Sequence, residues 1–121
     1  MADDLLVDPD TLREQVRDKY REVAVDPHRT FHFHVGRINA ARLGYAPDAV
    51  DALSDRAVES FAGVANPFSL GRLAPGERVL DLGCGAGTDS LVAAEMVGGH
   101  GHVTGIDMTS AMLAKARAAA A

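Results

Sequence analysis

The sequence predicts an α/β fold in which an N-terminal helical segment precedes the first strand–helix–strand–helix units of a parallel sheet. Three observations predict this fold. An amphipathic helical pattern lies near the N-terminus, β-rich runs begin after a Pro-Gly turn at 75–76, and a glycine-rich loop joins the first run to a helix. We therefore divide the chain into a helical cap segment, residues 1–75, and an incomplete α/β half-domain, residues 76–121.

The composition excludes several classes of function. The chain is 47% hydrophobic and 24% charged, which is typical of a globular protein. Its net charge of −5, without a clustered basic face, argues against a nucleic-acid or anionic-membrane partner. The N-terminus, Met1-Ala2-Asp3-Asp4, carries two acids where a signal peptide is basic, and no apolar run reaches about 18 residues. We therefore expect a cytoplasmic protein. The single cysteine, Cys84, excludes an intramolecular disulfide.

The cap segment contains one clear amphipathic helix and several short ones. Asp8-Pro9 is typical of a helix start. The helix, about 10–25, carries one apolar stripe with which we expect it to pack on the core. The stripe consists of Leu12, Val16, Tyr20 and Val23. Shorter helices are predicted at 48–53 and 55–61, each capped by its first aspartate, and Asn66-Pro67 starts a further turn.

A His-x-His pair, His32 and His34, raises the question of a metal site. Both side chains share one face if they lie on a strand, and imidazole is a common metal ligand. No cysteine lies nearby, and neither a third nor a fourth ligand is evident. We therefore predict no metal site and expect partly buried or substrate-facing histidines.

The α/β half-domain has the order strand, loop, helix, strand, helix. We predict strands at 78–82 and 102–107, a helix at 88–97 and a final helix capped by Thr109. The final helix reaches Ala121 without a stop signal, so we expect the sequence to end inside an element, as a truncated sheet does. Two parallel strands cover little apolar surface, and the exposed sheet edge is a candidate for self-association.

The glycine loop is the candidate ligand site. Gly83, Gly85 and Gly87 allow a tight turn and a close approach of ligand to backbone, and the following helix N-terminus favours an anionic group. Asp107, about twenty residues after Gly87, is placed to accept hydrogen bonds from ribose hydroxyls. These features suit NAD and S-adenosylmethionine (SAM) alike.

Two residues favour SAM over NAD. A dinucleotide fingerprint requires a third glycine where this chain has Thr88. Asp81, two residues before the loop, would repel a pyrophosphate but attract the ammonium and the cationic sulfur of SAM. The loop therefore predicts a SAM site.

Residues 79–87 resemble motif I of class I SAM-dependent methyltransferases. The runs 73–77, 105–109 and 112–117, together with the N-terminal helix at 16–24, are similar to arsenite methyltransferases. This resemblance implies a Rossmann-like sheet and SAM as cofactor.

The resemblance also implies roles for individual residues. The loop glycines Gly83, Gly85 and Gly87 would lie against the methionine moiety. Asp81 would lie near its amino group, Asp107 would hold the ribose and Met108 would pack on the adenine. Tyr20 would help to close the pocket.

One position departs from the family. Arsenite methyltransferases carry Gly-Cys-Gly-Asn-Pro ahead of motif I, and its thiolate binds trivalent arsenic. Here the matching stretch has Val64 in place of the cysteine, and valine cannot ligate a metalloid. We predict a SAM-dependent methyltransferase that acts on a small molecule, with no catalytic base assigned. The alternative is a non-catalytic SAM-binding or structural fragment of such an enzyme.

Overall fold

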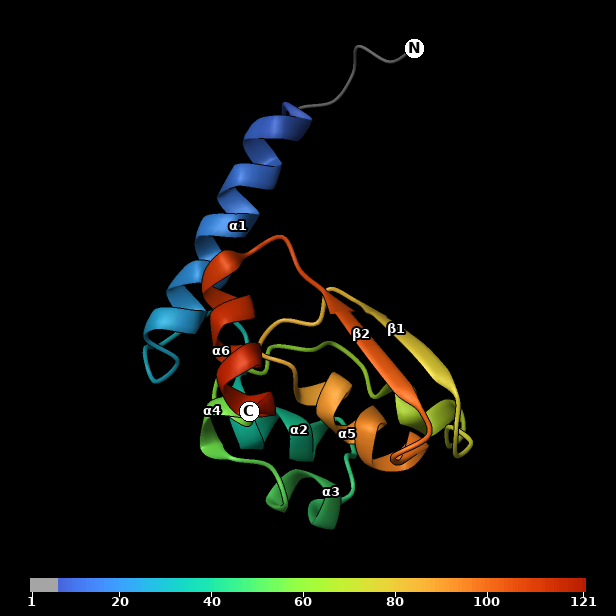
Figure 1. Ribbon diagram of the computed structural model, residues 1–121. Coiled ribbons are helices and arrows are strands. Elements are labelled where there is room, and N and C mark those ends of the chain that lie inside the picture. Colours follow the sequence, from blue (N-terminus) through green and yellow to red (C-terminus); the bar gives the residue numbers. More distant parts are fainter. Residues whose placement is uncertain (1–6) are drawn as a thin grey trace.

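The computed structural model describes residues 7–121 and confirms the α/β class, with helices from the first part of the chain packed beside a small parallel sheet (Figure 1). The acidic start, residues 1–4, lies outside the described residues. In chain order the elements are α1 (Pro9–Val25), α2 (Gly36–Arg42), α3 (Pro47–Asp51), α4 (Asp55–Val58), the 3-10 helix η1 (Pro67–Leu70), β1 (Arg78–Leu82), α5 (Thr88–Val97), β2 (His102–Ile106) and α6 (Ser110–Ala120). No helix within residues 7–121 is long and apolar enough to cross a membrane.

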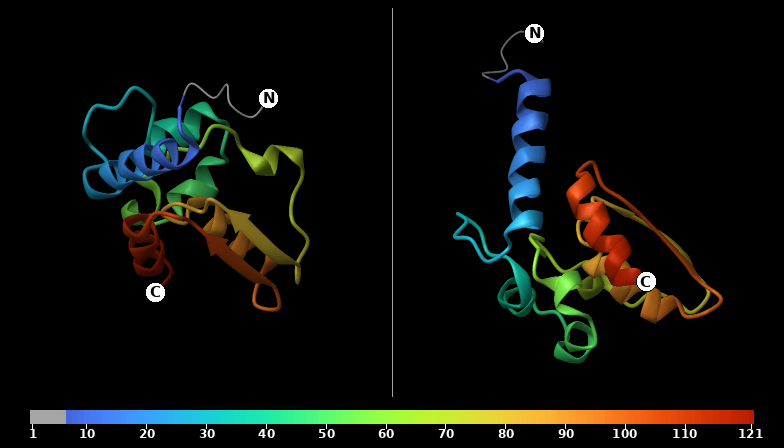
Figure 2. Two further views of the ribbon diagram at one scale, coloured as in Figure 1. Left: turned by 90° about the horizontal axis from the view of Figure 1, so that it is seen from above. Right: turned by 60° about the vertical axis from the view of Figure 1, so that its left-hand side comes forward.

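Helix α1 begins where its sequence predicts, but it docks only by its C-terminal end. The Asp8 carboxylate caps the helix by accepting a hydrogen bond from the Thr11 N–H at 2.8 Å. Val23 and Ala24 are buried against α6, whereas Leu12 is 48% exposed. The first turns rise away from the rest of the molecule (Figure 2). The expectation that the whole stripe packs on the core is therefore wrong for its N-terminal half.

The short helices differ from their predicted form. Helix α2 is not predicted by the sequence, and the N–H of its first residue, Gly36, donates to the Phe61 carbonyl at 2.8 Å. Asp48 and Asp55 are not helix caps, because Ala46 and Ser54 occupy those positions and both aspartates lie within the first turn. A long-range backbone contact, rather than a local signal, thus fixes where α2 starts.

The sheet consists of β1 and β2 paired in parallel, from Arg78 opposite His102 to Leu82 opposite Ile106. Helix α5 connects the strands and packs against both. The sheet face that α5 does not cover carries large apolar side chains that are exposed to solvent. Leu80, Leu82 and Ile106 are 57%, 73% and 51% exposed. This confirms the expectation that so small a sheet leaves apolar surface uncovered.

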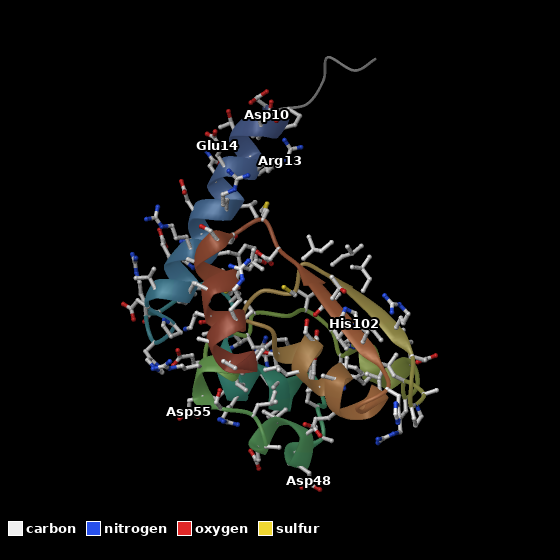
Figure 3. The ribbon with its side chains drawn as sticks, viewed as in Figure 1. Asp10, Arg13, Glu14, Asp48, Asp55 and His102 are labelled. Atoms are coloured by element: carbon white, nitrogen blue, oxygen red, sulfur yellow. The ribbon has the colours of Figure 1, made fainter. Side chains whose placement is uncertain are left out.

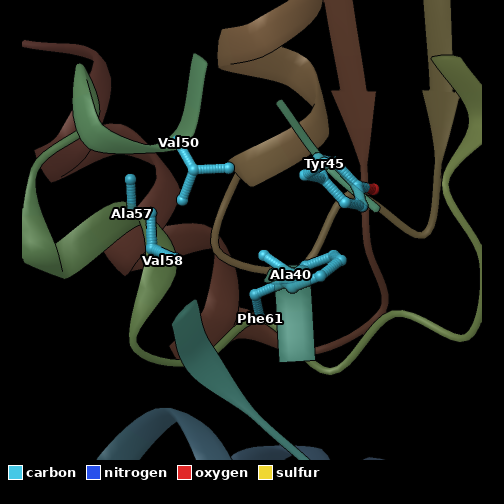
Figure 4. Packing of buried hydrophobic residues seen from close by; sticks show 6 residues of the cluster. All are labelled: Ala40, Tyr45, Val50, Ala57, Val58 and Phe61. Atoms are coloured by element: carbon cyan, nitrogen blue, oxygen red, sulfur yellow. The ribbon is translucent and has the colours of Figure 1, made fainter. Parts of the chain in front are cut away.

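Two hydrophobic clusters form the core, and each joins residues from before and after position 75. The first lies among the short helices and contains Ala40, Tyr45, Val50, Ala57, Val58 and Phe61 (Figure 4). Leu91 of α5 and Ala119 of α6 pack against it. The second cluster contains Val23, Ala24, Ala86 and Met112. The helical segment and the α/β segment therefore share their packing.

Candidate functional site

A cavity of about 400 Å³ opens beside the glycine loop. This volume falls within the range of roughly 300–1,000 Å³ that is common for small-molecule sites. Four segments form the wall: the loop and the start of α5, the end of α1, residues 60–64, and residues 107–112. The lining residues are Tyr20, Ser60, Phe61, Ala62, Gly63, Val64, Gly83, Cys84, Gly85, Ala86, Thr88, Asp89, Asp107, Met108, Thr109 and Met112.

The loop leaves β1 in a conformation that requires glycine. The φ angles of Gly83, Gly85 and Gly87 are +77°, +53° and +91°. The N–H groups of Gly83 and Cys84 both donate to the Ile106 carbonyl, at 2.7 and 2.9 Å, so the loop is fastened to the end of β2. Gly87 is the N-cap of α5 and has no side chain to bond the first N–H groups of that helix. Those groups remain free for a ligand.

Gly87 is the loop position at which a side chain should do most harm to the fold. An added Cβ would lie 3.3 Å from the Ala116 Cβ of α6, at a φ of +91°. We expect Gly87→Ala to lower the free energy of unfolding by about 1–3 kcal/mol, measured by urea denaturation. The control is Gly99→Ala, whose Cβ would have no atom within 4 Å. Equal unfolding free energies for the two variants would contradict this prediction.

Asp107 holds the loop and the start of α6 together. Its Oδ2 accepts a hydrogen bond from the Gly85 N–H at 2.9 Å, and its Oδ1 accepts one from the Thr109 N–H at 2.8 Å. Thr109 occupies the predicted N-cap position of α6, but its side chain makes no capping hydrogen bond. The Asp107 carboxylate therefore orders both sides of the cavity that it lines.

Two further carboxylates lie near the loop. Asp81 of β1 accepts a hydrogen bond from the Ser90 Oγ at 2.6 Å and does not line the cavity. Asp89, in the first turn of α5, does line it and accepts a hydrogen bond from the Tyr45 Oη at 2.5 Å. Burial raises the pKa of the Asp89 carboxyl above its usual value; the Tyr45 hydrogen bond opposes this shift and the nearby Asp81 charge adds to it.

Sequence reasoning missed Asp89. Its position directly after the loop is a weak local signal, because an acid in the first turn of a helix is common. Its partner, Tyr45, lies in the loop after α2, and only the folded chain brings the two together. Burial, followed by the hydrogen bond to Asp89, also raises the pKa of the Tyr45 phenol.

The other predicted residues divide between the cavity and its surroundings. Met108 and Tyr20 line the cavity, as do Gly83 and Gly85, whereas Gly87 lies outside the lining. Val64 also lines it and is 92% exposed.

Cys84 lines the cavity from the glycine loop. Burial raises the pKa of its thiol, and the charges of Asp107 and Asp81 raise it further. The side chain is therefore a protonated thiol at neutral pH rather than a nucleophilic thiolate.

The histidine pair does not lie on a strand. His32 and His34 are exposed in the loop before α2 and do not line the cavity, so the expectation that they are partly buried is wrong. Within residues 7–121, no group of three or more His, Cys, Asp or Glu side chains is arranged to hold a metal ion.

Polar contacts tie the segment 60–64 to its neighbours. The Asn39 Nδ2 donates to the Gly63 carbonyl at 2.9 Å. Lys115 of α6 bonds the Glu59 carboxylate at 2.6 Å and the Ser60 hydroxyl at 2.7 Å, and all three side chains are largely shielded from solvent. The Thr88 hydroxyl donates to the Ala57 carbonyl at 2.5 Å. The wall opposite the glycine loop is thus fixed at several points.

Comparisons with known proteins find similarity to methyltransferases. Residues 73–121 match the family described as methyltransferase domain. An arsenite methyltransferase of Halobacterium salinarum is 39% identical over 125 residues, which cover 91% of this chain and 32% of the relative. A 2-phytyl-1,4-naphtoquinone methyltransferase of Synechococcus elongatus is 37% identical over 84 residues, which cover 59% of this chain and 36% of the relative. The chain thus spans about a third of the length of these curated relatives.

A solved structure is also similar. It is that of an arsenic (III) S-adenosylmethionine methyltransferase from Chlamydomonas reinhardtii, with 42% sequence identity and a TM-score of 0.46. The match covers 66% of this chain and 24% of that one.

Proposed function

We propose that this arsenite-methyltransferase-like chain, whose residues 73–121 carry a class I methyltransferase domain, binds SAM beside the glycine loop and takes part in methyl transfer to a small molecule. The observation that carries the proposal is the cavity itself. The motif I loop and the Asp107 carboxylate, which were predicted separately from the sequence, line the same cavity of about 400 Å³.

The residues around the cavity fit the chemistry of SAM. Each Asp107 oxygen accepts one backbone N–H and keeps acceptor capacity for a ribose hydroxyl. The uncapped start of α5 suits the methionine carboxylate. Met108 is half-exposed and offers an apolar surface for the adenine. When bound, SAM supplies a methyl group activated by a positively charged sulfur.

We further propose that residues 1–75 act as a cap and residues 76–121 as the SAM-binding half-domain. Tyr20 of α1 and residues 60–64 line the same cavity as the loop, which supports this division. The contribution of these residues to the reaction is to exclude water and to align the acceptor with the methyl group, since methyl transfer is an in-line displacement. No residue is assigned as a general base.

The cap side of the cavity favours an apolar acceptor. Phe61, Ala62 and Val64 line that side. By the resemblance to arsenite methyltransferases, Val64 would occupy the position of their arsenic-binding cysteine. Cys84 is the single cysteine of the chain, and burial raises the pKa of its thiol. We therefore propose an apolar small molecule as acceptor rather than arsenite, and the phytyl naphthoquinone named for one relative is of this kind.

The proposal is tested by calorimetric titration with SAM, with NAD as control ligand, followed by transfer of an isotope-labelled methyl group. We expect SAM to bind, NAD not to bind, and the label to reach a naphthoquinol but not arsenite. Methylated arsenite would contradict the proposed acceptor, and a folded protein that does not bind SAM would contradict the whole proposal. Binding without transfer to either acceptor would favour the non-catalytic alternative.

A further inference from the structure

We propose that Asp89, held in place by Tyr45, is the counter-ion for the methionine ammonium group of SAM. This inference rests on the proposed function, because it requires SAM in the cavity beside the glycine loop. It assigns a binding role to Asp89 and a positioning role to Tyr45.

The placement of Asp89 supports this role. Its carboxylate lines the cavity from the first turn of α5, directly after the glycine loop. Oδ1 accepts the hydrogen bond from Tyr45, and the side chain is half-buried. Within residues 7–121 no fully buried side-chain oxygen or nitrogen lacks a hydrogen-bond partner, so Oδ2 is not sealed inside the protein. The carboxylate can therefore bind a ligand through that oxygen.

The negative charge at and around Asp89 favours the binding of a cation. No lysine, arginine or histidine in the described part of the chain forms an ion pair with Asp89, Asp81 or Asp107. A partly desolvated carboxylate without a cationic partner costs free energy, which a ligand cation offsets. Asp81 adds negative potential from β1 without reaching the cavity itself. The cavity thus favours a ligand that brings positive charge to the Asp89 carboxylate.

The position of Asp89 in the cavity favours the ammonium of SAM, rather than its cationic sulfur, as the group that Asp89 binds. Asp107 bonds the middle of the loop at Gly85, whereas Asp89 follows the end of the loop and contacts the helical core through Tyr45. In SAM the sulfur is attached next to the ribose, and the ammonium is at the far end of the methionine chain. A ligand with its ribose at Asp107 and its methionine along the loop therefore directs the ammonium toward Asp89.

Tyr45 is held rigidly enough to position this carboxylate. Its ring is buried and contacts Phe61 edge-on with centroids 5.2 Å apart (Figure 4). It contacts Phe68 in the same way, with centroids 6.2 Å apart. Edge-to-face pairs of this kind restrict the orientation of the ring. The phenol therefore presents its proton to Asp89 from a fixed point.

The test is calorimetric titration of the 121-residue chain with SAM, S-adenosylhomocysteine and 5′-methylthioadenosine. The first two ligands carry the ammonium, and the third retains adenine, ribose and a neutral sulfur but lacks it. We expect Asp89→Asn to weaken binding of the first two by roughly 10- to 100-fold, as for a lost charged hydrogen bond, and to leave methylthioadenosine unchanged. The control is Asp48→Asn, which removes an acid from the first turn of α3 at the exposed edge of the molecule (Figure 3).

A second measurement on the wild-type chain does not depend on how the variant folds. Only the ionised Asp89 carboxylate attracts a cation, so SAM affinity should fall as the pH is lowered through its raised pKa. Asp81 from β1 and Tyr45 act directly on the Asp89 carboxyl, and the other titratable groups that line the same cavity are Asp107, Cys84 and Tyr20. Tyr45→Phe removes the hydrogen bond that lowers the Asp89 pKa, so the loss of affinity should begin at a higher pH.

Each outcome separates this inference from the proposed function. If the wild-type chain binds SAM and a folded Asp89→Asn variant binds it equally well, the counter-ion role is wrong and the SAM site stands. Equal losses for all three ligands would show a merely structural role. A loss for SAM alone would assign Asp89 to the sulfur and overturn the ammonium assignment. A wild-type chain that binds none of the three overturns the proposed function and this inference with it.

Discussion

Replacement of Met112 by alanine should lower the free energy of unfolding by about 2–5 kcal/mol. Met112 is 2% exposed and packs with Val23 and Ala24 of α1 and with Ala86 of the glycine loop. Truncation leaves a cavity where α1, α6 and the glycine loop meet. The loss is a large fraction of the roughly 5–15 kcal/mol that stabilises a domain. Urea denaturation followed by circular dichroism measures it.

Met108→Ala is the matched control for this stability measurement. It makes the same truncation four residues earlier, where the side chain is 46% exposed. We expect it to change the free energy of unfolding by less than about 1 kcal/mol. A loss for Met112→Ala as small as the one expected for Met108→Ala would show that the packing of α1 against α6 contributes little to stability.

Replacement of Asp107 by alanine should weaken SAM binding by about 1–3 kcal/mol and also destabilise the fold. The carboxylate accepts hydrogen bonds from the Gly85 and Thr109 N–H groups, so its removal leaves both without a partner and releases the loop from α6. It also removes the proposed acceptor for the ribose hydroxyls. Calorimetry with SAM, together with urea denaturation, separates the two losses.

Asp107→Asn keeps one acceptor oxygen and removes the charge. We expect it to retain more stability than Asp107→Ala, because one of the two backbone N–H groups keeps its acceptor. Affinity for SAM equal to that of the wild-type chain in a folded Asp107→Ala variant would refute the ribose assignment.

The elements that the sequence predicted well are those with local determinants. The bounds of β1 and α5 match the predicted ranges 78–82 and 88–97. The loop between them contains alternating glycines, and positive φ angles at those positions stop the strand and start the helix without help from other segments. Asp8, which caps α1, acts on residues of its own turn.

The elements that the sequence did not predict depend on contacts between residues that are far apart in the chain. Helix α2 begins where Gly36 bonds Phe61, and no pattern near Gly36 signals this pairing. Leu12 is part of a regular apolar stripe, but a stripe cannot reveal how much of a helix another element covers. Periodicity predicts which face of a helix is apolar and leaves the extent of docking undetermined.

The residues of the candidate site also divide into those that local sequence patterns predict and those that depend on long-range contacts. The loop glycines and Asp107 were found from spacing alone, and all but Gly87 line the cavity. Of the two acids that flank the loop in sequence, Asp81 was predicted as a site residue and Asp89 was missed. In the folded chain Asp81 accepts a hydrogen bond from Ser90 and does not line the cavity, whereas Asp89 accepts one from Tyr45 and does line it. Both contacts depend on the fold and cannot be seen in the sequence.

The packing of α1 against α6 bears on the order in which the molecule assembles. Strand β1, helix α5 and strand β2 follow one another closely, so their contacts close short loops and should form early. The contact of Val23 with the Met112 cluster joins nearly opposite ends of the chain and carries a larger loop-closure entropy. Tyr20 and Met112 both line the cavity, so we expect the cavity to be completed in the last stage of folding. A ligand that fills it would therefore slow unfolding more than it speeds folding.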